Sequence, residues 1–512
     1  MSESQTTTSA TWSDRPRVTT SGGTVVGRAP HAGVTAFLGI PFARSSRFEP
    51  PLPTRWSGEL DATEHGPICP QIPGLLENVL GSGVPPMSED CLSLSVHVPE
   101  RALAPGSNGT FDPRPVLVWI HGGAYVNGSG SAPWYDGASL ARRGDVVVVS
   151  VNYRLGVFGF WRSNNLGLLD QIAALRWVRE NIGAFGGDPG NVTIFGESAG
   201  GSSVVALMAS PEASGLFHRV WAMSPSIGQY RTAARGEEIA DGFLRAAEAE
   251  DDEALLSMSV EKLLEIQSAT LATNGRAYDY FAPTFPGSGL PDDIVLAAST
   301  CPVPLVVGTT RDENRLFGAF SPEAASMNES RMRAIISALL TDPARDAVAH
   351  DSVAHDSLVD EAIELYRRHR PGETDAQIVM AVQTDEGFRR RAVDLADGRH
   401  AAGTVTHVYW FTWPSPAFGG LLGSCHALDI PFAFHNLEQP GVTVFTGDGP
   451  ERATVADAMS GEILRFAHEG SVSWPSHDPD SRATFRIDLE SEVVHDPEVE
   501  IRRFWERLRA TV

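Results

Sequence analysis

The stretch "TIFGESAGG", residues 193–201, places a serine where a β-prone run meets the start of a helix. In a G-x-S-x-G corner the glycines let the backbone fold sharply, and the serine is held at a strained turn above the edge of a sheet. The N–H group of the next residue lies at a helix N-terminus, where negative charge is favoured. Ser198 is therefore the predicted nucleophile and Ala199 a predicted oxyanion donor. For the motif alone, the alternative is a glycine-rich helix start.

A nucleophilic serine needs a base, and the base needs a carboxylate that orients it. After such a corner the acid and then the histidine follow in chain order. Asp312 and Glu313 come just past the buried run "VPLVVG", at the edge where open α/β sheets bind ligands. His426 follows in the glycine-rich loop "GGLLGSCHALD" and is the predicted base. The spacing does not separate the two acids, and a solvated acidic turn and a surface or core histidine are the alternatives.

The stretch "VLVWIHGGAYVNGSG" leaves an apolar run and enters a loop of small residues. The N–H groups of Gly123 and Ala124 are predicted to complete the oxyanion hole with that of Ala199. A flexible connector is the alternative, and no GK[ST] follows that would favour a phosphate-binding loop. Aromatic residues near the hole and near the acid are predicted to line the substrate cleft: Tyr125, Phe317 and Phe320.

These residues need a scaffold that brings distant segments together. The runs "VLVWI" and "VVVVSV" are apolar without alternation, which is typical of central strands covered on both faces. Strands and helices alternate around them, which predicts an α/β fold with a mostly parallel sheet. Residues about 230–300 and 320–400 read as helical insertions over the cleft. No linker composition divides the chain, so we expect a flexible tail over 1–16 and one domain over 17–512.

Composition narrows the classes of partner and cofactor. The 512-residue chain carries a formal net charge of −24, which disfavours nucleic acid and anionic membranes as partners. It contains no apolar run long enough to span a bilayer, and its first residues lack the apolar segment of a secretory signal. A cytoplasmic location is therefore expected. The four cysteines form no CxxC pair and the histidines no HExxH, so neither a metal nor another cofactor is predicted.

Taken in order, these and further stretches resemble one family, the type-B carboxylesterases, a branch of the α/β-hydrolases that includes the cholinesterases. The stretches run from about residue 17 to 508 and include "FLGIPFA", "SEDCLSLSVHVP", "VVSVNYRLGVFGF", "GLLDQIAALRWVRENIGAFGGDPGNVTIFGESAGG", "GLFHRVW", "GTTRDENRLF" and "GSCHALDIPFAF". The resemblance implies an α/β-hydrolase fold whose helical insertions cover the active-site cleft. It also implies a triad of Ser198, Glu313 and His426. The choice of Glu313 over Asp312 rests on this resemblance alone.

The resemblance also carries an expectation about activity. It implies a serine carboxylesterase of the bacterial or para-nitrobenzyl-esterase type, which acts through an acyl-enzyme on small to medium aryl and alkyl esters. No cofactor is implied, and a monomer or small homo-oligomer is expected. A carbamate or amide hydrolase with the same triad is the first alternative. A binding relative that has lost catalysis is a remote one, because such proteins lack part of the triad.

Two further features are implied only by the resemblance. Cys69 and Cys91 match positions that are disulfide-bonded in secreted relatives, and a cytosolic location would keep them reduced. The loop between them lacks the tryptophan with which cholinesterases hold choline, which argues against that activity. Arg44 and Glu89 resemble a structural ion pair of the family.

Overall fold

A computed structural model of the chain describes residues 15–74, 85–103, 112–273, 280–341 and 352–510. Residues 1–14 of the predicted tail lie outside these ranges, and the first strand, β1, begins at Arg17 (Arg17–Thr20). Among the described residues, no helix is both long and apolar enough to cross a bilayer.

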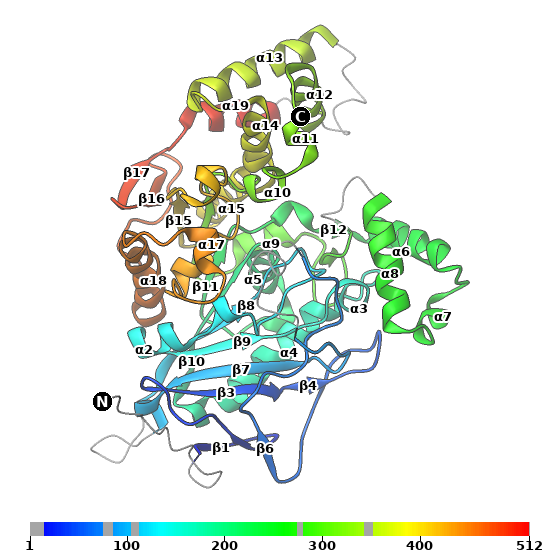
Figure 1. Cartoon of the computed structure of the whole chain (residues 1–512), viewed down its shortest axis with the longest axis vertical. Coiled ribbons are helices and arrows are strands. Elements are labelled where there is room, and N and C mark those ends of the chain that lie inside the picture. The colour runs from blue at the N-terminus through cyan, green and yellow to red at the C-terminus, as the bar shows by residue number, and fades with distance from the viewer. Residues whose placement is uncertain (1–14, 75–84, 104–111, 274–279, 342–351, 511–512) are drawn as a thin grey trace, which may run out of the picture.

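A single large sheet of ten strands organises the described chain (Figure 1). Its order is β17-β16-β15-β14-β11-β10-β8-β9-β7-β3. The six pairings from β9 to β16 are parallel, whereas β7 pairs antiparallel with both β9 and β3, and β17 pairs antiparallel with β16. The prediction of an α/β fold with a mostly parallel sheet is confirmed. The strands are β3 (Val34–Pro41), β7 (Ser93–Pro99), β8 (Arg114–Ile120), β9 (Val147–Val151), β10 (Gly187–Glu197), β11 (Arg219–Met223), β14 (Leu305–Thr310), β15 (Thr406–Phe411), β16 (Ala483–Ile487) and β17 (Glu492–His495).

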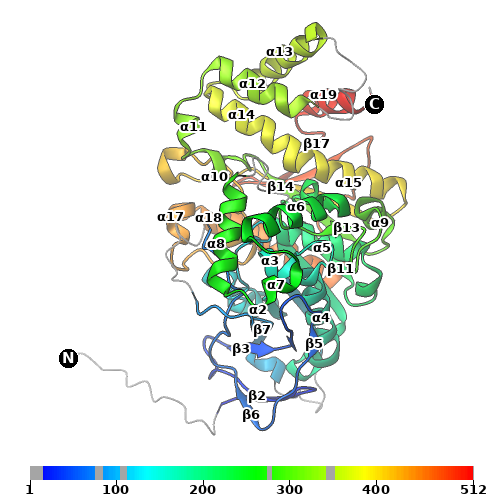
Figure 2. The same ribbon diagram turned by 90° about the vertical axis from the view of Figure 1, so that its right-hand side faces the viewer.

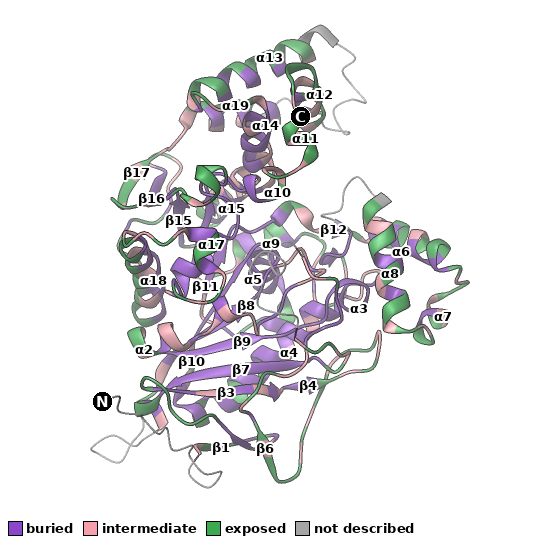
Figure 3. Ribbon diagram, viewed as in Figure 1, coloured by how far each residue is buried: buried purple, intermediate pink, exposed green. Residues whose placement is uncertain are grey.

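Helices cover both faces of this sheet, which explains why its central strands are apolar without alternation. Side chains alternate between the faces of a strand, and in β8 Val116 and Val118 face one core while Leu117 and Trp119 face the other. The strands are accordingly buried along their length (Figure 3). The first core includes α4 (Leu166–Asn181), α5 (Ala199–Ala209), α9 (Ile294–Thr300) and α15 (Arg390–Ala401); the second includes α2 (Ala138–Gly144), α16 (Ile430–Ala433) and α18 (Arg452–Glu469).

Both ranges predicted as helical insertions contain helices. In the second range a separate apolar core forms between α12, α13, α14 and the C-terminal helix α19, which lie together at one end of the molecule (Figure 2). This core brings the end of the chain against an internal insertion. The helices are α6 (Ala233–Ala247), α7 (Asp252–Leu256), α8 (Val260–Thr273), α11 (Pro322–Ala325), α12 (Glu329–Leu340), α13 (Ser352–His369), α14 (Asp375–Thr384) and α19 (Val499–Ala510).

The segments predicted to carry chemistry all follow strands of the parallel part of the sheet. The loop with Gly123 follows β8, Ser198 follows β10, Glu313 follows β14, and the loop with His426 follows β15. Because the carboxyl ends of parallel strands meet at one edge, the topology brings these four segments to the same edge, where open α/β sheets bind ligands.

Candidate active site

Ser198 occupies a sharp corner between β10 and α5. Its φ of 59° and ψ of −121° are rare for a residue with a side chain, and such strain persists only where the surroundings enforce it. Its N–H donates to the carbonyl of Met223, at 3.0 Å, which pins the corner to the end of the neighbouring strand. The residue is 9% exposed, so its hydroxyl side is nearly but not fully covered.

Close backbone approach explains the glycines on both sides of the serine. A Cβ on Gly200 would lie 2.0 Å from the carbonyl oxygen of Ile120, and one on Gly196 would lie 2.6 Å from the same atom. Because backbone atoms of the next strand cannot retreat as a flexible side chain can, only glycine allows this packing. The glycines therefore set how closely the corner sits against β8.

The loop after β8 lies directly against the serine. A Cβ on Gly122 would lie 3.0 Å from the Cβ of Ser198. Gly123 and Ala124 have positive φ values of 112° and 52°, and no hydrogen bond among the described residues uses their N–H groups. The N–H of Ala199, the first residue of α5, has no carbonyl one turn earlier in the helix to bond. The three predicted donors thus belong to segments that meet at Ser198.

Glu313 and His426 form a direct buried contact although they are far apart in sequence. Nδ1 of His426 lies 2.6 Å from Oε2 of Glu313, and Oε1 of Glu313 accepts the N–H of Thr310 at 2.8 Å. Glu313 is fully buried and His426 is 3% exposed. Because Nδ1–H donates to the carboxylate, the neutral ring carries its free lone pair on Nε2, the atom that a general base uses.

Nε2 of His426 lies 3.1 Å from Oε1 of Glu197, the residue before the serine. Although both residues are described, no hydrogen bond joins Ser198 to His426, and Nε2 faces the Glu197 carboxylate instead. Burial lowers the pKa of His426, but Glu197 and Glu313 outweigh it and raise that pKa to about 9. Burial raises the pKa of Glu197 to about 8, although His426 acts against it. The sequence analysis did not identify Glu197; its place beside the serine was the available signal.

A third buried carboxylate completes the surroundings of the histidine. Burial, with the charge of Glu313, raises the pKa of Asp429 to about 7. The hydroxyl of Tyr409, in β15, donates to Asp429 Oδ2 at 3.1 Å. This residue was also missed, although it stands three positions after His426. The imidazole thus lies in a buried environment with three carboxyl groups, and the charges of Glu197 and Glu313 favour its charged form.

Aromatic rings flank the imidazole. The rings of Phe317 and Phe388 have centroids 5.2 and 5.0 Å from that of His426. Phe317 is 40% exposed, as expected of a residue beside an opening, and Phe320 is 56% exposed and packs edge-on against Phe418. Phe388 was not identified from the sequence; it belongs to a five-residue π-helical turn, Asp385–Arg389, that no sequence pattern indicated.

Tyr125 is the exception among the predicted cleft residues. It is fully buried, and its ring packs against Phe160 at 4.8 Å. Its φ of 61° turns the backbone at this point, and its carbonyl accepts the N–H of Gly156. Tyr125 therefore belongs to the first core, and its role as a cleft residue stays a prediction.

Two structural predictions have different outcomes. All four cysteines fall in the described ranges and none is disulfide-bonded, although a hydrogen bond with Cys69 raises the pKa of the Cys91 thiol. The expected ion pair of Arg44 with Glu89 is wrong: Glu89 pairs with Arg47, at 2.6 and 2.9 Å. Arg47 follows the short strand β4 (Ala43–Arg44), and its guanidinium also donates to three carbonyls of the 255–258 segment.

A cavity of about 70 Å³ is lined by residues of β14, β15, β16, the π-helical turn, α15 and α19. Trp410 and Trp505 line it, and none of the predicted triad does. Within the described ranges, no cluster of three or more His, Cys, Asp or Glu side chains is arranged to hold a metal ion.

Comparison with known proteins identifies the family that this chain resembles. Residues 14–505 match the Carboxylesterase family. The chain is 36% identical to a para-nitrobenzyl esterase of Bacillus subtilis, with 95% of this chain and 97% of that protein covered. It is 32% identical to a phenmedipham hydrolase of Pseudarthrobacter oxydans, with 91% and 94% covered.

Solved carboxylesterase structures share the fold of this chain. A carboxylesterase of Geobacillus stearothermophilus superposes with a TM-score of 0.81 at 35% identity, over 96% of this chain and all of that one. A para-nitrobenzyl esterase superposes with a TM-score of 0.80, also at 35% identity, over 96% and 99% of the two chains.

Proposed function

Because the chain belongs to the Carboxylesterase family, we propose that it hydrolyses carboxylic esters through an acyl-enzyme formed on Ser198. The family membership makes it a carboxylic-ester hydrolase; the proposal assigns the residues. Ser198 is the nucleophile, His426 the general base and then acid, and Glu313 the carboxylate that orients the imidazole. Gly123, Ala124 and Ala199 supply the oxyanion hole.

The mechanism follows from these placements. Neutral His426 takes the proton of Ser198 Oγ as the hydroxyl attacks the ester carbonyl, and the backbone N–H groups stabilise the tetrahedral oxyanion. The imidazolium, held by Glu313 and near Glu197, returns its proton to the leaving alcohol. Water then repeats the cycle on the acyl-enzyme. This mechanism requires the ring to move from Glu197 toward Ser198 Oγ when substrate binds, as catalytic hydrogen bonds often tighten only in the complex.

The contact of His426 Nδ1 with Glu313 at 2.6 Å carries this proposal. It joins loops after two different strands, and it leaves Nε2 3.1 Å from Oε1 of Glu197, the residue that precedes Ser198. A structural histidine would not need a strained serine and two unused backbone donors beside it.

A p-nitrophenyl ester series from acetate to octanoate tests the proposal, with wild type and Ser198→Ala assayed in parallel. We expect Ser198→Ala to lower kcat by about 10⁶. Retention of more than a few per cent of activity in a clean preparation would refute the assignment of Ser198. The series also measures how long an acyl chain the site accepts, and an aryl carbamate included in it tests the alternative bond class.

We further propose small to medium aryl and alkyl esters as substrates, with Phe317 and Phe320 lining the cleft. A cytoplasmic bacterial enzyme, monomeric or a small homo-oligomer, is the setting that fits best. The unbonded Cys69 and Cys91 agree with a reducing compartment, and the two full-length relatives named above come from bacteria. Size-exclusion chromatography with light scattering measures the assembly.

A further inference from the structure

Asp312, the residue before Glu313, forms hydrogen bonds to the loop that carries His426. Its Oδ2 accepts the N–H of Ser424 at 3.0 Å, and its own N–H donates to the carbonyl of Ser424 at 2.8 Å. The two bonds close a ring between the loop that follows β14 and the loop that follows β15. Asp312 is 5% exposed, so water does not compete for these bonds.

A third hydrogen bond continues this pairing to the candidate catalytic residues themselves. The N–H of His426 donates to the carbonyl of Glu313 at 3.2 Å. Ser424 is also tied to the sheet, because its hydroxyl donates to the carbonyl of Phe411 at 2.8 Å, at the end of β15. Besides the contact of His426 Nδ1 with Glu313 itself, only the bond to the Asp312 carboxylate joins the two loops through a side chain; the other two bonds are between backbone groups.

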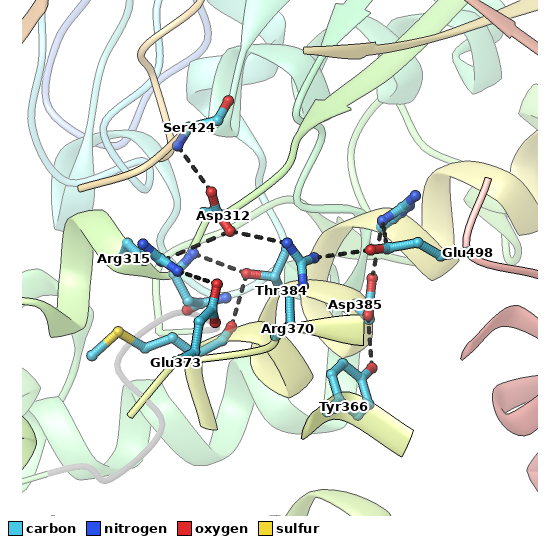
Figure 4. A network of polar contacts seen from close by, with 12 residues as sticks. Asp312, Arg315, Tyr366, Arg370, Glu373, Thr384, Asp385, Ser424 and Glu498 are labelled. Atoms are coloured by element: carbon cyan, nitrogen blue, oxygen red, sulfur yellow. Dashed lines mark hydrogen bonds and ion pairs between the residues drawn. The ribbon is translucent and has the colours of Figure 1, made fainter. Parts of the chain in front are cut away.

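Buried arginines balance the charge of this carboxylate. Nη1 of Arg370 donates to Asp312 Oδ1 at 3.3 Å, and Nε of Arg315 lies 3.8 Å from the same atom (Figure 4). The Arg370 side chain is 1% exposed and its Nη2 lies 3.4 Å from Glu498, ahead of α19. A buried carboxylate without such a partner would be costly. The Asp312 carboxylate is therefore paired with Arg370, which directly follows α13.

The opposite loop is shaped to receive the carboxylate. Gly423 has a φ of 57°, and a Cβ there would lie 2.5 Å from Asp312 Oδ2. The glycine thus leaves the space that the oxygen occupies, and its backbone turn presents the next N–H, that of Ser424, to it.

We propose that Asp312 is a positioning residue for the ester hydrolysis, holding the Glu313 loop against the His426 loop so that the two side chains keep their contact. The role rests on the proposed function of Glu313 and His426. Asp312 touches neither substrate nor the reacting atoms; it acts through the backbone of Ser424.

The test compares Asp312→Ala and Asp312→Asn in the full chain, with p-nitrophenyl butyrate as substrate. Activity is expressed per site titrated with a fluorophosphonate that labels the nucleophilic serine. We expect Asp312→Ala to lower kcat about 10- to 100-fold, because small displacements of catalytic groups are that costly, with KM nearly unchanged. Asp312→Asn keeps an oxygen that accepts the Ser424 N–H, so most of the kcat should return.

Tyr366→Phe is the matched control. It removes a hydroxyl, 2.7 Å from Asp385, that lies in the same buried network but touches neither loop. It should lower the melting temperature and leave kcat per titrated site unchanged. Equal kcat losses in Tyr366→Phe and Asp312→Ala, or equal losses in Asp312→Asn and Asp312→Ala, would overturn the positioning role.

Gly423→Ala tests the same bond from the facing loop if Asp312→Ala does not fold. Its methyl group displaces the carboxylate, so a folded variant should show the same loss of kcat, and an unchanged kcat would contradict the proposal. The two hypotheses fail separately. An active Ser198→Ala enzyme refutes the proposed function, whereas an inactive Ser198→Ala with a fully active Asp312→Ala refutes only the positioning role.

Discussion

Nε2 of His426 lies 3.1 Å from Oε1 of Glu197, the residue that precedes Ser198 in the chain. The imidazole therefore has a carboxylate at each nitrogen, with Glu313 2.6 Å from Nδ1. An imidazolium between two carboxylates is strongly favoured over the neutral ring. The same arrangement that stabilises the charged intermediate thus makes the resting base harder to deprotonate.

The first prediction concerns the pH dependence that follows. With the pKa of His426 raised to about 9, kcat/KM should rise with pH and level off only near that value, because the base acts when neutral. Glu197→Gln removes a charge that raises this pKa, so the rising limb of the kcat/KM profile should move to lower pH. Stopped-flow measurements of kcat/KM across pH give the position of this limb in each enzyme. A limb at the same pH in both enzymes would show that Glu197 does not tune the histidine.

The second prediction concerns the orienting acid. Glu313→Gln has no negative charge to stabilise the imidazolium, and its amide NH₂ group can hold the ring in the wrong tautomer, so kcat should fall by about 10⁴, the cost of the corresponding change in a well-studied serine triad. The control is Glu89→Gln, which loses charge in the ion pair with Arg47 and should affect stability alone. Near-normal turnover in Glu313→Gln would instead direct attention to Asp312 as the acid.

The third prediction concerns the corner itself. Gly200→Ala places a methyl group 2.0 Å from the Ile120 carbonyl oxygen, so either the strand or the helix start must shift and move Ser198 and the Ala199 N–H with it. We expect kcat to fall by about 10² or more and the melting temperature to drop. In the control Gly183→Ala the added methyl group has no other atom within 4 Å. This variant should change neither kcat nor the melting temperature by much. Comparable melting temperatures for both variants would contradict the packing argument.

The fourth prediction concerns thiol chemistry. Cys425 stands next to His426 but is fully buried, and burial, with the charge of Glu313, raises the pKa of its thiol. Because the thiolate is the reactive form, N-ethylmaleimide should leave the native enzyme active. Peptide mass spectrometry should find the label on the partly exposed Cys301 alone. A modified Cys425 in folded, inactivated protein would mean that this loop opens.

The sequence could predict most of the candidate site because local geometry left a local signature. Glycines mark the corner at Ser198, and small residues mark the loop at Gly123. The sequence could not predict the contacts between distant segments. Glu313 and His426 are 113 positions apart. The roles of Glu197 and Asp312 become visible only when the segments that carry these two residues are brought together. The sheet was predictable for a similar reason, since burial on both faces leaves uninterrupted apolar runs.

The burial of Tyr125 was not predictable from the sequence, for a physical reason as well. An aromatic residue beside an oxyanion loop can face the cleft or the core, and the choice depends on backbone dihedrals. Positive φ values at Ala124 and Tyr125 send the ring inward to Phe160. Residue type alone carries no information about this turn, because few residues other than glycine adopt it.

The fifth prediction concerns the leaving group. Phe317 lies against the imidazole and is 40% exposed, so an aryl leaving group could pack on its ring as His426 protonates the oxygen. Phe317→Ala should therefore raise KM for phenyl acetate more than for ethyl acetate, since aromatic contacts add about 0.5–1.5 kcal/mol. Val444→Ala, another exposed apolar side chain outside these ring contacts, serves as the control. Equal changes for both esters would place the aryl group elsewhere in the cleft, and the more exposed Phe320 would be the next residue to replace.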